Sequence, residues 1–119
     1  MSIETPAKLL LIYVDESDRW GNSSIPLYEA IVEFLYEAGV DGATANDGVM
    51  GFGTNRRLHK KGLFGITDDR TVTISVIDNE AKLRSLFPKL KSMVGEGLIF
   101  LMDGEVIHQG IDPKGKPNE

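Results

Sequence analysis

PLYEAIVEFLYEAG, residues 26–39, has the pattern of one amphipathic helix that ends at a glycine. Pro26 suits the first turn of a helix, where its missing N–H is not needed, and Gly39 suits the position after a helix end. Apolar residues recur at intervals of three and four on one stripe, and Glu29, Glu33 and Glu37 fall on the other side. The stripe comprises Leu27, Ala30, Ile31, Phe34, Leu35 and Ala38. One side of this helix therefore packs against another layer.

Four segments around this helix have the composition of β-strands. KLLLIYV, residues 8–14, is short, apolar and rich in branched side chains, which predicts a central strand buried on both faces. A second strand is expected at about 42–52, directly after the helix. TVTISV, residues 71–76, alternates polar and apolar residues, which predicts one buried face. LIFLM, residues 98–102, is apolar throughout, which predicts a fourth strand in an inner or interface position.

A second helix is expected between the third and fourth of these strands. Asp78 or Asn79 can cap its start, and Gly95 and Gly97 close it. Pro88 lies inside the pattern and should kink the helix or split it in two, because proline removes one helix hydrogen bond. The apolar stripe comprises Leu83, Leu86, Phe87, Leu90 and Val94.

This order of elements predicts an α+β, ferredoxin-like fold, in which β-α-β is repeated twice. The expected sheet has four antiparallel strands with both helices on one face. Its other face would be apolar, with Val49 and Phe52 adding to the first and fourth strands, and such a surface is a liability in a monomer. We therefore expect a homo-oligomer. Residues 1–109 are expected to form one domain, and residues 110–119, GIDPKGKPNE, a disordered tail.

Composition narrows the class of protein. The 119 residues are 41% hydrophobic and include no cysteine, so the chain suits one globular domain without disulfides or thiolate metal sites. The longest apolar run, residues 9–14, is far shorter than the roughly 20 residues of a membrane helix. The first residues lack the basic and apolar regions of a signal peptide. We therefore expect a cytoplasmic protein that does not insert into membranes.

The charges are unevenly distributed. Arg56, Arg57, Lys60 and Lys61 are four of the 13 basic residues, which leaves nine against 18 acidic residues. Such an acidic chain is not expected to bind nucleic acid. The basic cluster follows the triplet Gly51–Gly53, which favours a small anionic ligand. The alternative is a solvated loop, since each like-charge pair about 6 Å apart in water costs only about 0.7 kcal/mol.

Signals for metal binding or catalysis are weak. His59 and His108 form no helical pair and have no cysteine partner, so no metal site is expected. Asp15, Glu16 and Asp18 lie close to Trp20, and this acidic group is interpreted as turn and capping residues, with packing for the tryptophan. No nucleophile elbow, Walker loop or dinucleotide fingerprint is present. We expect no catalytic residue, no required cofactor and no enzyme, with a small hydrolase or phosphotransferase as an alternative.

Four segments together resemble a known family: KLLLIYVDESDRW, PLYEAIVEFLYEAGVDGATANDGVMGFG, TVTISVIDNEAKL and GEGLIFLMDGEVI. They are similar to the small PII-like proteins long catalogued as a domain of unknown function, from about Lys8 to Ile107. The resemblance implies a ferredoxin-like homotrimer related to the nitrogen-regulatory PII signalling proteins.

PII proteins bind adenine nucleotides in clefts between subunits, with the base of a long loop after the second strand and a short glycine loop before the fourth. Glycine at such places lets the backbone approach a phosphate. PII proteins have a lysine where this chain has Leu98, and a basic segment where it has His108 and Gln109. The resemblance is therefore also consistent with a ligand that carries less charge than ATP. The nucleotide-binding residues that the resemblance implies are Gly51, Phe52, Gly53, Arg56, Arg57, His59, Lys60, Gly95, Glu96 and Gly97.

The sequence thus predicts a PII-like signalling protein that binds ATP, ADP, AMP or a similar small anion at inter-subunit clefts. The loop at 54–69 would report occupancy by changing conformation. The alternative from another class is a trimeric interaction module that docks on a transporter, a channel or another protein without any small ligand.

Overall fold

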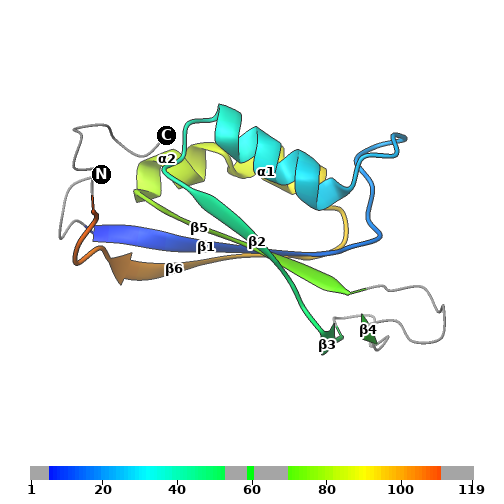
Figure 1. Ribbon diagram of the computed structural model, residues 1–119. Helices are drawn as coiled ribbons and strands as arrows, with labels where there is room; N and C mark the ends of the chain where they lie inside the picture. Colours follow the sequence, from blue (N-terminus) through cyan, green and yellow to red (C-terminus); the bar gives the residue numbers. More distant parts are fainter. Residues whose placement is uncertain (1–5, 53–58, 61–69, 111–119) are drawn as a thin grey trace.

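The computed structural model describes residues 6–52, 59–60 and 70–110. Along the chain, the elements are β1 (Pro6–Asp15), α1 (Leu27–Glu37), β2 (Ala43–Asp47), β3 (Met50–Gly51), β4 (His59–Lys60), β5 (Thr71–Asp78), α2 (Glu80–Ser85), α3 (Phe87–Met93) and β6 (Leu98–Glu105). The main sheet is antiparallel, with the strand order β2-β5-β1-β6. All three helices cover one face of it (Figure 1). This arrangement confirms the predicted fold class.

The alternation of side chains along the two inner strands builds the core. Leu10, Ile12 and Val14 of β1 are buried beneath the helices, and the intervening residues of β1 face the other side. On β5 the buried set is Val72, Ile74 and Val76. The prediction that β1 is central is confirmed, but only its helix-facing residues are fully buried along this stretch. The other face of the strand stays half-exposed.

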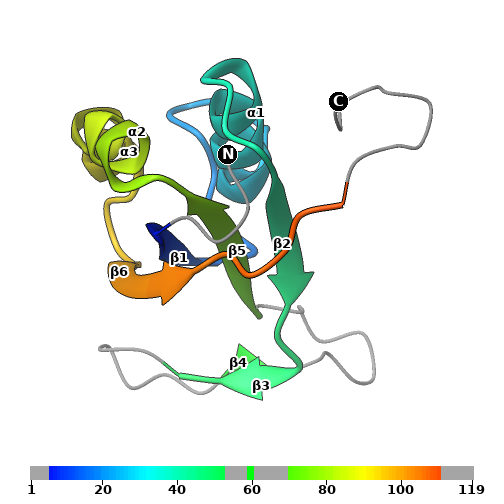
Figure 2. The same ribbon diagram turned by 90° about the vertical axis from the view of Figure 1, so that its left-hand side faces the viewer.

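The first helix matches its predicted pattern. Leu27, Ile31 and Leu35 are buried, and Gly39 follows the helix end with a positive φ of 82°. Such a φ favours glycine over residues with a Cβ. Figure 2 shows α1 above β2 and β5, and the α2–α3 pair above β1 and β6.

Pro88 divides the second helical region as predicted. α2 ends at Ser85 and α3 begins at Phe87, with the proline in the first turn of α3, where it removes no helix hydrogen bond. At the start of α2, the Asn79 side chain accepts a hydrogen bond from the backbone N–H of Lys82 at 2.8 Å. Asn79 is therefore the N-cap of α2, and its neighbour Asp78 is not.

Two strand predictions need correction. The segment 42–52 is not one strand, because β2 ends at Asp47 and the Gly48 N–H turns to donate to the Thr71 carbonyl at 2.7 Å. Met50 and Gly51 then form the short strand β3, which pairs with β4 away from the main sheet (Figures 1 and 2). For residues 98–102 the sequence predicts an inner or interface position. The inner position is wrong, because β6 is an edge strand of the sheet, and the interface position stays a prediction. The apolar run of β6 reflects an uncovered face, described below.

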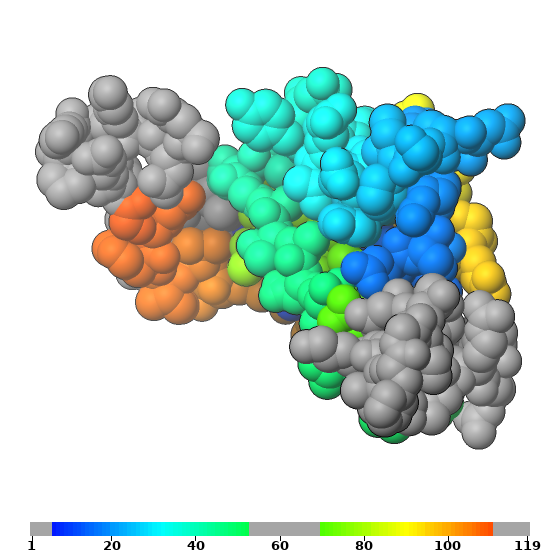
Figure 3. All heavy atoms as spheres, turned by 45° about the vertical axis from the view of Figure 1, so that its right-hand side comes forward, coloured from blue at the N-terminus to red at the C-terminus, as the bar shows by residue number. Residues whose placement is uncertain are grey.

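The segment after β6 passes the start of β2, and the space-filling view shows it (orange) beside β2 (green) (Figure 3). Within the described ranges, none of the helices has both the length and the apolar content needed to cross a membrane. The predicted tail, residues 110–119, lies outside the described residues except for Gly110.

Candidate functional site

The sheet face opposite the helices is largely apolar. Its centre consists of directly opposed pairs from β1 and β6, such as Leu11 with Phe100 and Leu9 with Met102. Phe100 is 47% exposed and Met102 is 45% exposed, and in the described part of the chain no helix covers this side. We call this surface the open face. It comprises Leu9, Leu11, Tyr13, Ile77, Leu98, Phe100 and Met102.

The two predicted glycine segments lie at the same end of the sheet. β6 starts opposite Tyr13 and β5 starts opposite Asp15, near the C-terminal end of β1. The Gly48 N–H also donates its hydrogen bond to the Thr71 carbonyl at this end of the sheet. We call it the glycine end. Gly51 and Phe52 follow the outer strand β2, whereas residues 95–97 precede the other outer strand, β6. At about 4.8 Å per strand spacing, the two edges are about 14 Å apart.

The glycines at this end differ in the space around them. Gly97 has a φ of 158°, and a Cβ there would overlap the Tyr13 carbonyl oxygen and approach Val94 Cγ1 to 2.9 Å. Close packing therefore requires Gly97. At Gly51 and Gly95 a Cβ would meet no atom of the described chain within 4 Å. No side chain therefore shields the backbone at these two glycines, and the exposed residue 96 lies between Gly95 and Gly97.

The predicted basic cluster is described only in part. Gly53, Arg56 and Arg57 lie outside the described residues, as does most of the predicted loop at 54–69. His59 and Lys60 are described as backbone only, in β4, where they pair with Gly51 and Met50.

Arg70 is a cation at the glycine end that the sequence analysis did not single out. Its side chain is only 15% exposed, and Nη2 lies 3.4 Å from Asp47 Oδ2 and 3.6 Å from Glu16 Oε1. Asp47 ends β2 and Arg70 directly precedes β5, so this pair joins both ends of the intervening loop. An arginine directly before the strand at 71–76 was the available sequence signal.

The acidic group after β1 has structural contacts. Asp18 Oδ2 accepts a hydrogen bond from the Asp15 N–H at 3.0 Å, and Glu16 pairs with Arg70. The Lys89 ammonium lies 5.2 Å from the centre of the Trp20 ring, so α3 covers the tryptophan. These contacts fit the predicted turn and packing roles.

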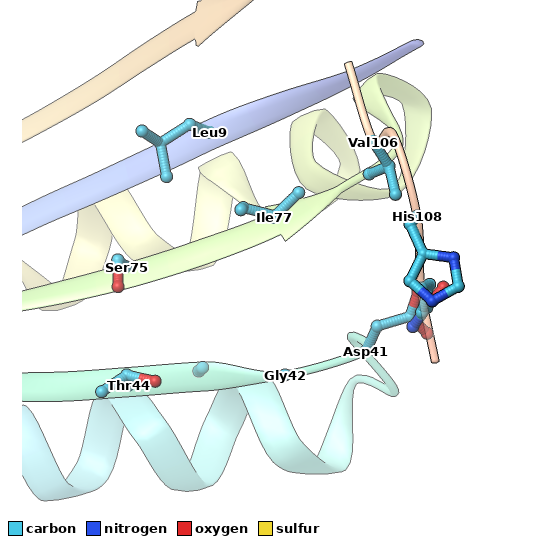
Figure 4. Close-up of a pocket in the computed structure, with 10 residues that line it drawn as sticks. Leu9, Asp41, Gly42, Thr44, Ser75, Ile77, Val106 and His108 are labelled. Atoms are coloured by element: carbon cyan, nitrogen blue, oxygen red, sulfur yellow. The ribbon is translucent and has the colours of Figure 1, made fainter. Parts of the chain in front are cut away.

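A pocket of about 430 Å³ lies at the opposite end of the sheet, which we call the pocket end. In Figure 4, Leu9, Ser75 and Ile77 line it from β1 and β5, and His108 lies beside Asp41 at its edge. An apolar floor with a few polar groups at the rim is typical of small-molecule sites. The full lining is Leu9, Asp41, Gly42, Ala43, Thr44, Ser75, Ile77, Val106, His108 and Gln109. Sequence reasoning missed this pocket, because its residues come from separate segments.

No group of three or more His, Asp or Glu residues that could hold a metal ion occurs among the described residues.

Near the pocket end, charged side chains join β1, β6 and α2. Lys8 Nζ donates a hydrogen bond to Asp103 and lies 3.7 Å from Glu80 Oε1, and Arg84 Nε also donates to Glu80. The Asp103 hydrogen bond raises the pKa of Lys8, and the same bond lowers the pKa of Asp103. The Arg84 hydrogen bond lowers the pKa of Glu80. Each shift favours the charged form, which suits an ion-pair network and not proton transfer.

Comparison with known proteins places this geometry in context. The model of the family DUF190, described as "Uncharacterized ACR, COG1993", matches residues 7–106. The UPF0166 protein of Aquifex aeolicus strain VF5 is 32% identical over 101 residues, covering 85% of this chain and 93% of the relative. A UPF0166 protein of Methanocaldococcus jannaschii is 31% identical over 101 residues, covering 84% and 91%.

Solved structures with a similar fold include CPII of Thiomonas intermedia K12, described as a nitrogen regulatory PII-like protein. Its complex with ADP, AMP and bicarbonate has a TM-score of 0.59 and 22% identity, covering 87% of this chain and 90% of that chain. Its complex with ADP and bicarbonate has a TM-score of 0.58 at the same identity and coverage. These matches confirm the predicted PII-like family resemblance and the ferredoxin-like fold.

Proposed function

The chain belongs to the DUF190 family, and we propose that it is a cytoplasmic PII-like regulatory protein that binds an adenine nucleotide in clefts between the subunits of a trimer. Structural neighbours from Thiomonas intermedia hold ADP, AMP and bicarbonate, which motivates the choice of ligand. A shared fold does not by itself transfer a ligand. The proposal therefore depends on the geometry of this chain's own sheet.

The observation that carries the proposal is the separation of two incomplete half-sites. The glycine end offers backbone groups and Arg70, and the pocket end offers an apolar floor with a polar rim. Leu9 at the pocket end and Asp15 at the glycine end are six residues apart on β1, about 20 Å at 3.4 Å per residue. A nucleoside diphosphate is too short to contact both ends of one chain. In an oligomer, the glycine end of one subunit can meet the pocket end of the next.

The two half-sites suit different parts of a nucleotide. The pocket has Leu9 and Ile77 for the flat surface of a base, and Thr44 and Ser75 hydroxyls that can donate or accept hydrogen bonds at its edge. The glycine end suits phosphates, because Gly51 and Gly95 have no side chain over their backbone and a phosphate can compete with Asp47 and Glu16 for the Arg70 guanidinium. The ligand would therefore lie with its base against one subunit and its phosphates against the next.

The open face supports the assembly that this site needs. Leu98, Phe100 and Met102 on the edge strand β6 remain about half exposed, and a contiguous apolar patch of this kind marks an interaction surface. Packing of open faces from three subunits would bury them together. We infer that the trimer forms through the β6 side of the open face, which leaves Leu9 and Ile77 to the pocket.

The segment between β2 and β5, which contains the predicted loop at 54–69, is the proposed reporter of occupancy. Asp47 and Arg70 join its two ends beside the phosphate half-site, so a phosphate that attracts Arg70 would also disturb the loop attachment. The role of this protein is then regulatory and not enzymatic, and the nucleotide is a ligand and not a cofactor.

Isothermal titration with ATP, ADP, AMP and cyclic AMP tests the proposal. We expect saturable binding of at least one adenine nucleotide, and loss of binding in Arg70→Gln at the glycine end and in Thr44→Trp, which fills the pocket. Lys91→Met, an exposed change on α3, is the matched control and should bind normally. Absence of binding by every nucleotide at millimolar concentration would reject the proposed function.

A second role, docking on a protein target such as a transporter, is favoured by one observation. Val49, Met50 and Phe52 are 71%, 61% and 56% exposed around the short strand β3. Exposed apolar groups on a projecting segment are typical of protein contacts. The test compares capture of a target protein by the wild type and by a variant with Met50→Ser and Phe52→Ser. Equal capture by both proteins would count against this role.

A further inference from the structure

Asp78, the last residue of β5, is a buried carboxylate with only 1% of its surface exposed. Burial of a charge is costly unless it is paired and hydrogen-bonded. Asp78 accepts hydrogen bonds from the backbone N–H groups of Asn79 at 2.7 Å and of Asp41 at 3.1 Å. Because Asn79 caps α2, helix capping does not explain why Asp78 is buried there.

Lys82 completes this arrangement from the first turns of α2. Its Nζ lies 3.7 Å from Asp78 Oδ2 and donates a hydrogen bond to the Gly39 carbonyl at 2.8 Å. Asp78 and Lys82 together therefore hold a backbone acceptor and a backbone donor of the connection between α1 and β2. We call this pair the Asp78–Lys82 clamp.

The clamped connection runs directly into the pocket. Gly39 carries the positive φ that turns the chain away from α1, and Asp41 is both bonded to Asp78 and part of the pocket lining. From Asp41 the chain continues through Gly42 and Ala43 to Thr44 along the pocket wall. Neither Asp78 nor Lys82 lines the pocket itself.

We propose that the Asp78–Lys82 clamp positions the 41–44 wall of the pocket for its ligand. This inference rests on the proposed function, in which the wall receives the base of an adenine nucleotide. Asp78 and Lys82 are positioning residues, because they act on the wall without contacting the ligand. If the connection is released, the wall must be ordered when the ligand binds, and this ordering lowers the affinity.

The clamp differs from a purely structural ion pair in the consequence of removing Lys82. The Lys82 side chain is 35% exposed, whereas the Asp78 side chain is only 2% exposed and keeps its two backbone hydrogen bonds when Lys82 is replaced. Loss of Lys82 should therefore lower the stability of the domain and, beyond that, speed exchange at Asp41 and weaken the pocket, effects that a purely structural ion pair would not produce while the core amides stay protected.

The test compares Lys82→Met with wild-type protein and with the matched control Lys91→Met, using ADP as the probe. We expect ADP binding to Lys82→Met to be about fivefold weaker, which corresponds to about 1 kcal/mol. Hydrogen exchange of the Asp41 amide should become faster, while the amide of Ile74 in the core is unchanged. Lys82→Arg should restore both properties, because a guanidinium can still pair with Asp78 and donate to Gly39.

Asp78→Asn is the second variant, because it removes the charge and keeps the side-chain volume. It should weaken ADP binding at least as much as Lys82→Met. If the wild-type protein binds ADP, the clamp inference alone is overturned when either the ADP affinity or the rate of Asp41 amide exchange is unchanged in both variants. Absence of ADP binding by the wild-type protein instead rejects the proposed function, and the clamp inference with it.

Discussion

Replacing Phe100 with glutamate should dissociate the proposed trimer without unfolding the subunit. Phe100 lies on the open face with 47% of its surface exposed, opposite Leu11. An aromatic side chain buries about 200 Å² when fully covered, so about 95 Å² remain for a partner subunit to cover. At about 25 cal/mol per Å², this surface contributes about 2.4 kcal/mol per subunit, or about a 50-fold factor in the association constant for each substituted subunit. Burial of the new carboxylate would add to this loss.

Sedimentation velocity provides the assay, because a trimer has three times the 13.1 kDa mass of one chain. Phe100→Glu should sediment as a monomer at concentrations where the wild-type protein is a trimer, with unchanged far-ultraviolet circular dichroism. Tyr36→Glu is the matched control, since Tyr36 is an aromatic residue that is 77% exposed on α1, outside the open face. Equal trimer content in Phe100→Glu and wild-type protein would refute the assignment of the open face as the interface.

Three further predictions concern the subunit itself. Gly97→Ala should lower the free energy of unfolding by about 2 kcal/mol, because the new Cβ overlaps the β1 backbone, whereas Gly95→Ala should change it little; equal urea midpoints would contradict the packing explanation. Asn79→Ala should cost about 1 kcal/mol in urea unfolding through loss of the α2 cap, and no loss would show that the cap is dispensable. Lys8 lowers the pKa of Asp103, so the stability from this pair is present at neutral pH and is lost as pH falls through the lowered pKa. The difference in unfolding free energy between wild-type protein and Asp103→Asn should therefore narrow below about pH 4, and a constant difference would contradict this linkage.

Local patterns made most of the fold predictable. The stripe from Leu27 to Ala38 and the break at Pro88 depend on neighbouring residues only, so the sequence was sufficient for both. The position of β6 was not predictable, because a run such as LIFLM is equally apolar in an inner strand and in an edge strand with an open face. β2 ends before Gly48, because the Gly48 N–H donates a hydrogen bond to the Thr71 carbonyl. Thr71 is 23 positions away, so the residues around Gly48 do not predict this strand end.

The candidate site was predictable only at the glycine end. Gly51 and Gly95 belong to short glycine-rich segments that are visible in the sequence. The pocket combines residues near positions 9, 41–44, 75–77 and 106–109, which the antiparallel register brings together. The two ends of the Asp41–Asp78 hydrogen bond are 37 residues apart, so the sequence identified Asp78 only as a helix-cap candidate.

The central claim is that one nucleotide site is built from the glycine end of one subunit and the pocket end of another. Mixing two inactive variants tests it most directly: Arg70→Gln, defective at the glycine end, and Thr44→Trp, defective at the pocket end. Neither variant alone should bind ADP. After unfolding and refolding as an equal mixture, about a quarter of the sites should combine two intact halves, because each ring contact pairs the subunits at random. Recovery of about a quarter of the wild-type ADP-binding capacity is the predicted result, and no recovery in mixed trimers would contradict the account.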